Sequence, residues 1–141
     1  MTSKTACVDT NFFIRILTND DPAQTQAALS IFRKAVNGEI TLVINDLLIA
    51  EIIWVLESSY QLNADDIRQK MLMVLNTPGL KVEPADLSSR VQALNLYAEK
   101  NIDYIDAYIV TWMKTHDIAI IYTFDKKHFS RIDGIEVTVP Q

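Results

Sequence analysis

The chain has 141 residues, 49% of them hydrophobic and 22% charged, and its net charge is −5. This length and composition are typical of one globular domain with a core of ordinary size, and they exclude a repetitive or low-complexity chain. The negative charge and the scattered Lys and Arg residues argue against simple electrostatic binding of nucleic acid, but they allow an enzyme whose metal ions supply positive charge locally.

Nothing in the sequence predicts export or insertion into a membrane. Met1–Thr5 is not followed by an apolar stretch long enough for a signal peptide. The longest nearly apolar run, Leu47–Leu56, has ten residues, whereas a membrane-spanning helix needs roughly 20. Cys7 is the only cysteine, which excludes an internal disulfide and favours a role in core packing. We therefore expect a cytoplasmic protein that forms a single domain over residues 1–141.

Short apolar runs rich in β-branched residues alternate along the chain with longer segments whose apolar residues recur every three or four positions. The first pattern predicts buried strands, and the second predicts amphipathic helices. Asp21-Pro22 is typical of a helix start, and Thr77-Pro78-Gly79 is typical of a helix end. In chain order, the expected elements are a strand at Thr5–Val8, helices at Phe12–Leu17 and Ala23–Val36, a strand at Ile40–Ile44, helices at Leu47–Ser59 and from Asn63 to about Asn76, a strand at Leu80–Glu83, helices at Asp86–Lys100 and from Asp103 or Ile105 to about Thr115, and strands at Ile118–Tyr122 and Ile135–Val139.

This alternation of strands and helices predicts the fold class. Strands connected through helices usually form a parallel sheet with helices on its faces. We therefore expect an α/β fold with a mostly parallel central sheet of about five strands and helices on both faces. Sites in such sheets lie beyond the carboxyl ends of the strands. Asp9 directly follows the first strand, so its carboxylate is expected at the edge of the sheet that carries the site.

Four acidic residues lie in apolar surroundings. They are Asp9 after "ACV", Glu51 within "LLIAEIIWVL", Asp106 within "YIDAYIV" and Asp125 after "IAIIYTF". Burying a charge is costly unless the charge is paired or bound to a metal. None of the four has a Lys or Arg beside it, apart from two lysines directly after Asp125. Gathered in space, such carboxylates would repel one another, and a hard cation such as Mg²⁺ or Mn²⁺ would relieve that repulsion.

Each carboxylate also has a purely structural interpretation. Asp9 suits the N-cap of the helix that follows it. Glu51 could face solvent, although its apolar neighbours leave no wide polar face on the helix. Asp103 and Asp106 are three residues apart, which suits two ligands on one helix face, or a cap followed by an acid in the first turn. Asp125 suits a turn. The set of four is harder to explain in this way than any single member.

Four segments, in order, carry a family resemblance: "VDTNFFIRILTNDDPAQ", "LLIAEIIWVL", "NIDYIDAYIV" and "IYTFDKKHFSRIDGIEV". Over nearly the whole chain they resemble the motifs of PIN-domain ribonucleases, in particular those of VapC-type toxins from bacterial type II toxin–antitoxin pairs. The resemblance implies metal-assisted hydrolysis of RNA phosphodiester bonds with Mg²⁺ or Mn²⁺ as cofactor. It also implies a toxin that forms a homodimer and binds a small antitoxin protein.

The same resemblance implies roles for individual residues. The implied catalytic and metal-binding acids are Asp9, Glu51, Asp106 and Asp125. Asp9 and Asp106 are expected to bind metal directly, and Asp106 is aligned with the family's principal ligand because "DAYIV" resembles that helix. Asp103 is then a secondary ligand or the helix cap. The residues expected to support the acids are Thr10, Asn11, Asp103 and Thr123.

Other functions remain compatible with the sequence. A metal-dependent DNA nuclease or phosphatase would use the same acids, and a non-catalytic interaction domain would use none of them. No Ser-His-Asp or Cys-His set and no Gly-rich phosphate loop is apparent, and His116 and His128 are expected to be structural or surface residues. The large aromatic residues are expected mostly in the core, with some available to line a groove for an antitoxin segment. They are Phe12, Phe13, Trp54, Tyr60 and Trp112.

Overall fold

A computed structural model describes residues 4–84, 86–129 and 132–141 of the chain. Its centre is a five-stranded sheet in the order β3-β2-β1-β4-β5, and every neighbouring pair of strands is parallel. The strands are β1 (Lys4–Val8), β2 (Ile40–Ile44), β3 (Leu80–Val82), β4 (Ile120–Tyr122) and β5 (Glu136–Thr138). The predicted α/β fold with a parallel sheet of five strands is confirmed.

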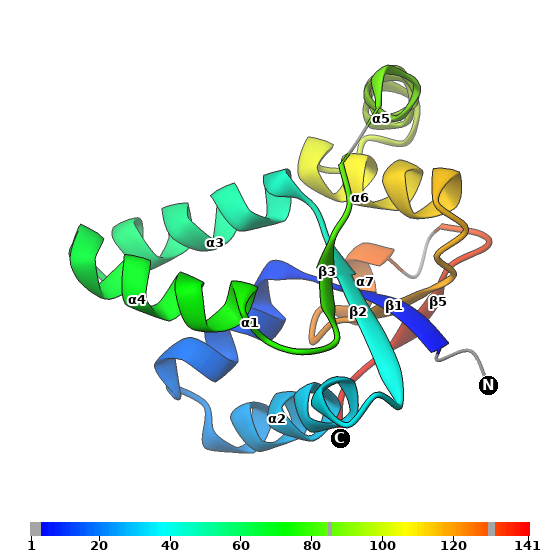
Figure 1. Cartoon of the computed structure of the whole chain (residues 1–141). Helices are drawn as coiled ribbons and strands as arrows, with labels where there is room; N and C mark the ends of the chain where they lie inside the picture. Colours follow the sequence, from blue (N-terminus) through cyan, green and yellow to red (C-terminus); the bar gives the residue numbers. More distant parts are fainter. Residues whose placement is uncertain (1–3, 85, 130–131) are drawn as a thin grey trace.

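The helices form layers around this sheet. They are α1 (Thr10–Thr18), α2 (Pro22–Val36), α3 (Asp46–Ser58), α4 (Ala64–Leu75), α5 (Leu87–Lys100), α6 (Tyr104–Thr115) and α7 (Lys126–Phe129). In Figure 1, α6 lies above the sheet with α5 outside it, α2 lies below the sheet, and α3 and α4 extend side by side to the left. The four-residue helix α7 was not predicted, and the other boundaries lie within two residues of the predicted ones.

The core lies between the sheet and these helices. Cys7, Phe12, Phe13 and Trp112 are fully buried, as the sequence predicts for a core cysteine and most of the aromatic residues. Trp54 is an exception, because 65% of its surface is exposed. It lies on the same stripe of α3 as two other exposed residues, at positions 46 and 50, so the helix turns it to solvent.

The carboxyl ends of the two central strands, β1 and β4, are held together beyond the strands themselves. The backbone N–H of Asp9 donates to the carbonyl of Tyr122 at 3.2 Å, which joins the end of β1 to the end of β4. The N–H of Thr123 in turn donates to the carbonyl of Thr138 at the end of β5, at 3.1 Å. The first residues after β1 and β4 therefore lie side by side, although more than 110 positions separate them in sequence. No helix among the described residues is both long and apolar enough to cross a membrane.

Candidate active site

All but one of the predicted site residues line a single pocket at the carboxyl edge of the sheet. The lining residues among them are Asp9, Thr10, Asn11, Glu51, Asp103, Asp106 and Asp125. The pocket has a volume of about 190 Å³, which is room for a hydrated cation and a phosphate group. No described residue of the lining is Lys, Arg or His. The remaining predicted residue, Thr123, lies beneath the pocket and binds Asp9.

Asp9 is held in place from two sides. Its side chain is 8% exposed, and it follows β1 with an extended backbone as the N-cap of α1. One carboxylate oxygen, Oδ1, accepts a hydrogen bond from the backbone N–H of Phe12 at 3.2 Å. The other, Oδ2, accepts a hydrogen bond from the Thr123 hydroxyl. These two bonds fix the carboxylate, and each oxygen keeps a second lone pair for a ligand.

Thr123 connects two of the acids. Its hydroxyl oxygen donates to Asp9 and accepts a hydrogen bond from the backbone N–H of Asp125 at 2.9 Å. Because Thr123 is fully buried, this bridge is shielded from water. The segment after β4 is thereby fastened to the end of β1, which places Asp125 on the same pocket as Asp9.

Glu51 reaches the pocket from α3, and Thr10 positions it. The Thr10 hydroxyl, on the first residue of α1, donates to Oε1 of Glu51. Thr10 is buried and Glu51 is half-buried. The hydrogen bond ties the start of α1 to the middle of α3, so Glu51 points into the pocket and does not face solvent.

Asp103 and Asp106 enter from the start of α6. Asp103 is the N-cap of this helix, and its Oδ1 accepts a hydrogen bond from the backbone N–H of Ile105 at 2.9 Å. Asp106 lies in the first turn and is half-buried. Both side chains line the pocket. Asp103 is therefore the helix cap, one of the two roles that the sequence leaves open for it, and its role as a secondary metal ligand stays a prediction.

The carboxylates are close enough to perturb one another. The pKa of Asp9 is raised from 3.8 to about 6. Burial is the main cause, and the negative charges of Asp106 and Glu51 add to it, whereas the hydrogen bonds from Thr123 and Phe12 act in the opposite direction. The folded protein therefore carries an unfavourable negative charge at this position at neutral pH.

The chemistry of this donor set fits a hard divalent cation. Every charged group that lines the pocket is a carboxylate, and Mg²⁺ and Mn²⁺ prefer oxygen ligands. Among the described side chains, no three acids, histidines or cysteines are already close enough together to enclose one ion. In proteins, Mg²⁺ usually keeps several of its waters and takes one or two direct carboxylates.

The pocket also has apolar walls that the sequence analysis did not assign to it. They are formed by Val55, Ile109 and Phe129. Val55 lies four residues after Glu51, and Ile109 lies three residues after Asp106, so helical spacing alone could have placed both on the site-facing side of their helices. Phe129 comes from α7, a helix too short to leave a periodic signal.

Two described residues with reactive side chains, Cys7 and His116, do not line this pocket. Burial raises the pKa of the Cys7 thiol, which keeps it protonated and unreactive. His116 follows α6, and its Nδ1 lies 2.9 Å from the carbonyl oxygen of Trp112, which agrees with its predicted structural role. The side chain of His128 lies outside the described part of the structure.

Comparisons with known proteins agree with this architecture. The family model described as "PIN domain" matches residues 6–135. No curated protein matches the chain.

Several solved structures share the fold. One is the VapC20 toxin of Mycobacterium tuberculosis, described as cleaving the sarcin-ricin loop, which has a TM-score of 0.73 and 19% identity over 94% of this chain and 98% of its own. VapBC2 of Rickettsia felis, bound to a promoter DNA fragment, has a TM-score of 0.75 and 14% identity over 97% and 99%. A toxin–antitoxin complex from Klebsiella pneumoniae has a TM-score of 0.69 and 19% identity over 96% and 98%.

The buried charge of Asp9 predicts a pH-dependent effect of Asp9→Asn on stability. As the pH rises from about 4 to about 6, the unfolded chain loses the Asp9 proton while the folded chain keeps it, so the wild-type protein loses stability over this range. Without metal, Asp9→Asn should therefore be more stable than the wild type above pH 6, by up to about 3 kcal/mol, and should have no such advantage at pH 4. Urea unfolding in EDTA at both pH values measures this difference, and an equal effect at both would contradict it.

Proposed function

The chain belongs to the PIN-domain family, and from that premise we propose that it is a metal-dependent ribonuclease that hydrolyses phosphodiester bonds in RNA and acts as the toxin of a toxin–antitoxin pair. The observation that carries the proposal is the gathering of five carboxylates, from α3, α6 and the ends of β1 and β4, around one pocket without a lining cation. We take residues 1–141 as one PIN-like domain that acts in the cytoplasm, where RNA is available.

In this proposal the quartet Asp9, Glu51, Asp106 and Asp125 holds the metal, Mg²⁺ or Mn²⁺. Asp9 and Asp106 would bind it directly, while Glu51 and Asp125 would bind directly or through water. A bound divalent cation lowers the pKa of a coordinated water and neutralises charge on the scissile phosphate. The other residues prepare this set. Thr123 and the N–H of Phe12 keep the Asp9 carboxylate in one orientation, and Thr10 does the same for Glu51.

The remaining groups of the pocket suit a nucleotide. Val55, Ile109 and Phe129 offer apolar contact beside the carboxylates, which suits the base or ribose next to the scissile phosphate. Asn11 is exposed at the rim, where its amide can donate a hydrogen bond to a phosphate oxygen. No His, Lys or Arg is among the described lining residues, so the proton for the leaving oxygen would come from water or from a carboxyl group of the pocket.

An antitoxin partner is part of the same proposal. The toxin–antitoxin complexes that share this fold come from several bacteria, including Klebsiella pneumoniae and Salmonella typhimurium. In this chain, a groove beside α1 and α4 is lined by the apolar residues Ile16, Leu17, Leu62 and Met73, with polar residues at positions 66, 69 and 70. An apolar segment of an antitoxin would fit such a groove.

A homodimer is the second proposed assembly. The outer helix α5 packs mainly on α6, and its outward face presents three large apolar side chains. They are Leu87, Val91 and Leu94, with exposed fractions of 73%, 50% and 55%, and the half-exposed ring of Tyr97 lies beside them against Tyr104 of α6. An apolar stripe of this kind is typical of an interface, and a second copy of the chain would cover it. Sedimentation of the purified chain as a monomer at all concentrations would contradict this assembly.

The function is tested by cleavage of matched substrates. The purified chain should cut single-stranded or structured RNA in Mg²⁺ or Mn²⁺, leave DNA of the same sequence and phosphomonoesters largely intact, and lose activity in EDTA. Re-addition of the metal should restore activity. Cleavage that persists after exhaustive EDTA treatment would exclude the metal mechanism, and a preference for DNA or phosphomonoesters would replace the ribonuclease by a DNA nuclease or a phosphatase.

Substitution of the acids ranks their roles. Asp9→Asn and Asp106→Asn should abolish measurable cleavage without unfolding the protein, because the amide keeps the shape of the side chain but lacks the charge that binds a hard cation. Asp103→Asn should cost much less, because Asn also caps helices well. Single-turnover rates in metal titrations, with circular dichroism as the folding control, measure the ranking. If Asp9→Asn and Asp106→Asn kept full activity and Asp103→Asn lost activity, the metal ligand would be Asp103 and not Asp106.

The toxin role predicts an effect in cells. Induced expression of the chain without a partner should arrest growth, and Asp9→Asn, expressed to the same soluble level, should not. The matched variant separates loss of RNA from the burden of expression. Unchanged growth in the presence of soluble and active wild-type protein would sink the toxin role while leaving the ribonuclease activity intact.

A further inference from the structure

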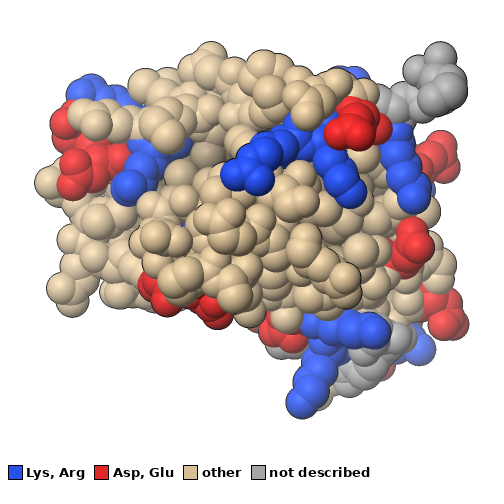
Figure 2. Space-filling view, turned by 90° about the horizontal axis from the view of Figure 1, so that it is seen from below, with Lys and Arg blue, Asp and Glu red and all other residues tan. Residues whose placement is uncertain are grey.

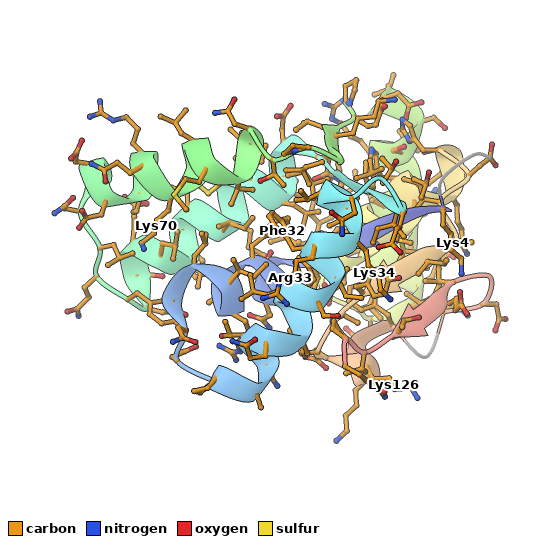
Figure 3. All side chains as sticks on the ribbon, turned by 60° about the horizontal axis from the view of Figure 1, so that its bottom comes forward. Lys4, Phe32, Arg33, Lys34, Lys70 and Lys126 are labelled. Carbon is orange, nitrogen blue, oxygen red and sulfur yellow. The ribbon has the colours of Figure 1, made fainter. Side chains whose placement is uncertain are left out.

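The fold gathers on one side of the molecule several basic residues that are scattered in the sequence. We define the basic face by Lys4, Arg33, Lys34, Lys70 and Lys126. Figure 3 shows them on β1, α2, α4 and α7, spread across the side of the molecule that lies below the sheet in Figure 1. In the space-filling view of this side, blue groups lie on both sides of a broad uncharged surface (Figure 2). One red group lies beside the blue row, and the others lie mostly toward the edges.

The helix in the middle of the basic face carries no acidic residue. The segment from Pro22 to Gly38 contains no Asp or Glu, although the whole chain has 18 of them. Its exposed or half-exposed polar side chains include Gln26 and Ser30, which can donate hydrogen bonds without adding negative charge. The uncharged surface between the cations therefore does not repel a polyanion.

Most cations of the basic face have no acidic partner within the part of the chain that the structure describes. Arg15, Arg68 and Lys81, all outside this face, form ion pairs with Asp20, Asp65 and Glu83. By contrast, no ion pair with a described residue involves Lys4, Arg33, Lys34 or Lys126, and all four are exposed. The ammonium of Lys70 donates one hydrogen bond, to the carbonyl of Leu17 at 3.2 Å, and keeps two donors for another ligand.

The basic face connects to the candidate active site through two elements. Lys126 directly follows Asp125, one of the acids of the pocket. The central helix, α2, packs on α1, and the first residues of α1 line the same pocket. Lys4 starts β1, and Arg33 and Lys34 precede the start of β2, so these three cations lie toward the amino edge of the sheet. An RNA strand that leaves the pocket past Lys126 would reach them by following the length of the strands.

We propose that the basic face holds the phosphates of the RNA strand that flanks the scissile bond. The proposal rests on the ribonuclease function above and adds the place where a long substrate binds. Unpaired cations distributed over several elements suit the repeated charges of an extended nucleic-acid backbone, which is bound through charge neutralisation and release of counterions. An acidic peptide would be an alternative ligand for the same charges, and the experiment below separates the two.

The test compares two double variants that remove the same charge. Arg33→Gln/Lys34→Gln removes two cations of the basic face, and Lys100→Gln/Lys114→Gln removes two exposed lysines elsewhere. All four residues lie in the last turn of a helix, so both variants change net charge and helix ends alike. Binding of an RNA of about 30 nucleotides is measured in EDTA over a range of salt concentrations, with Asp9→Asn in every protein to prevent cleavage.

The Arg33→Gln/Lys34→Gln variant should bind the long RNA several-fold more weakly, and the slope of log K against log salt should fall by about 1.4, since each phosphate contact with a single strand contributes about 0.7. Lys100→Gln/Lys114→Gln should keep the parent slope. With Asp9 restored, the first variant should show a higher KM for the long RNA and unchanged kinetics on an RNA of about four nucleotides.

The outcomes distinguish this inference from the proposed function. If the parent protein neither binds nor cleaves RNA, the ribonuclease proposal itself fails. If the parent cleaves RNA but Arg33→Gln/Lys34→Gln keeps the parent slope of log K against log salt, only the basic face is excluded as the RNA path. The same conclusion follows if both double variants lower this slope equally. A variant that binds RNA normally but loses an acidic partner protein would assign the face to that partner.

Discussion

The carboxyl edge of the sheet is built around one buried carboxylate, that of Asp9 at the end of β1. Burial and the neighbouring acids raise its pKa to about 6, so at neutral pH the folded chain holds a charge that would be better solvated in the unfolded state. Hydrogen bonds from Thr123 and from the backbone of Phe12 offset part of this cost. A bound cation would offset the rest, which is the physical reason to regard the cluster as a site and not as a folding device.

Helix capping and the candidate site use the same atoms. Asp9 caps α1, and Asp103 caps α6. A cap fixes the side chain because its oxygen must reach a backbone N–H of the first turn. Capping therefore aims both carboxylates at the space where the two helices begin, and that space is the pocket. The structural and functional interpretations of these residues are not alternatives, since the local stability of each helix start is what positions the acids.

Sequence reasoning was most successful where one pattern decides one property. The alternation of β-branched runs and helical spacing predicted the parallel sheet, and the position of Asp9 after a strand predicted the edge that carries the pocket. It failed where the answer depends on what covers a face. The spacing of Leu87, Val91 and Leu94 shows that they share one side of α5, but not that this side is left exposed. For the same reason, the sequence predicted that the large aromatic residues lie mostly in the core but did not say which would be exposed, and Trp54 is exposed. The short helix α7 and its contribution of Phe129 left no periodic signal at all.

The distribution of charge shows why net charge alone does not exclude RNA as a ligand. A total of −5 suggests repulsion of RNA, but at physiological ionic strength charges are screened beyond roughly 8 Å. A strand on the surface therefore responds to the side chains beneath it and hardly to the total. Here the fold concentrates carboxylates in one pocket, where a cation can neutralise them, and leaves α2 without any acid. Because α2 packs against the helix that begins at the pocket, the acid-free surface and the carboxylate pocket belong to neighbouring elements of the fold.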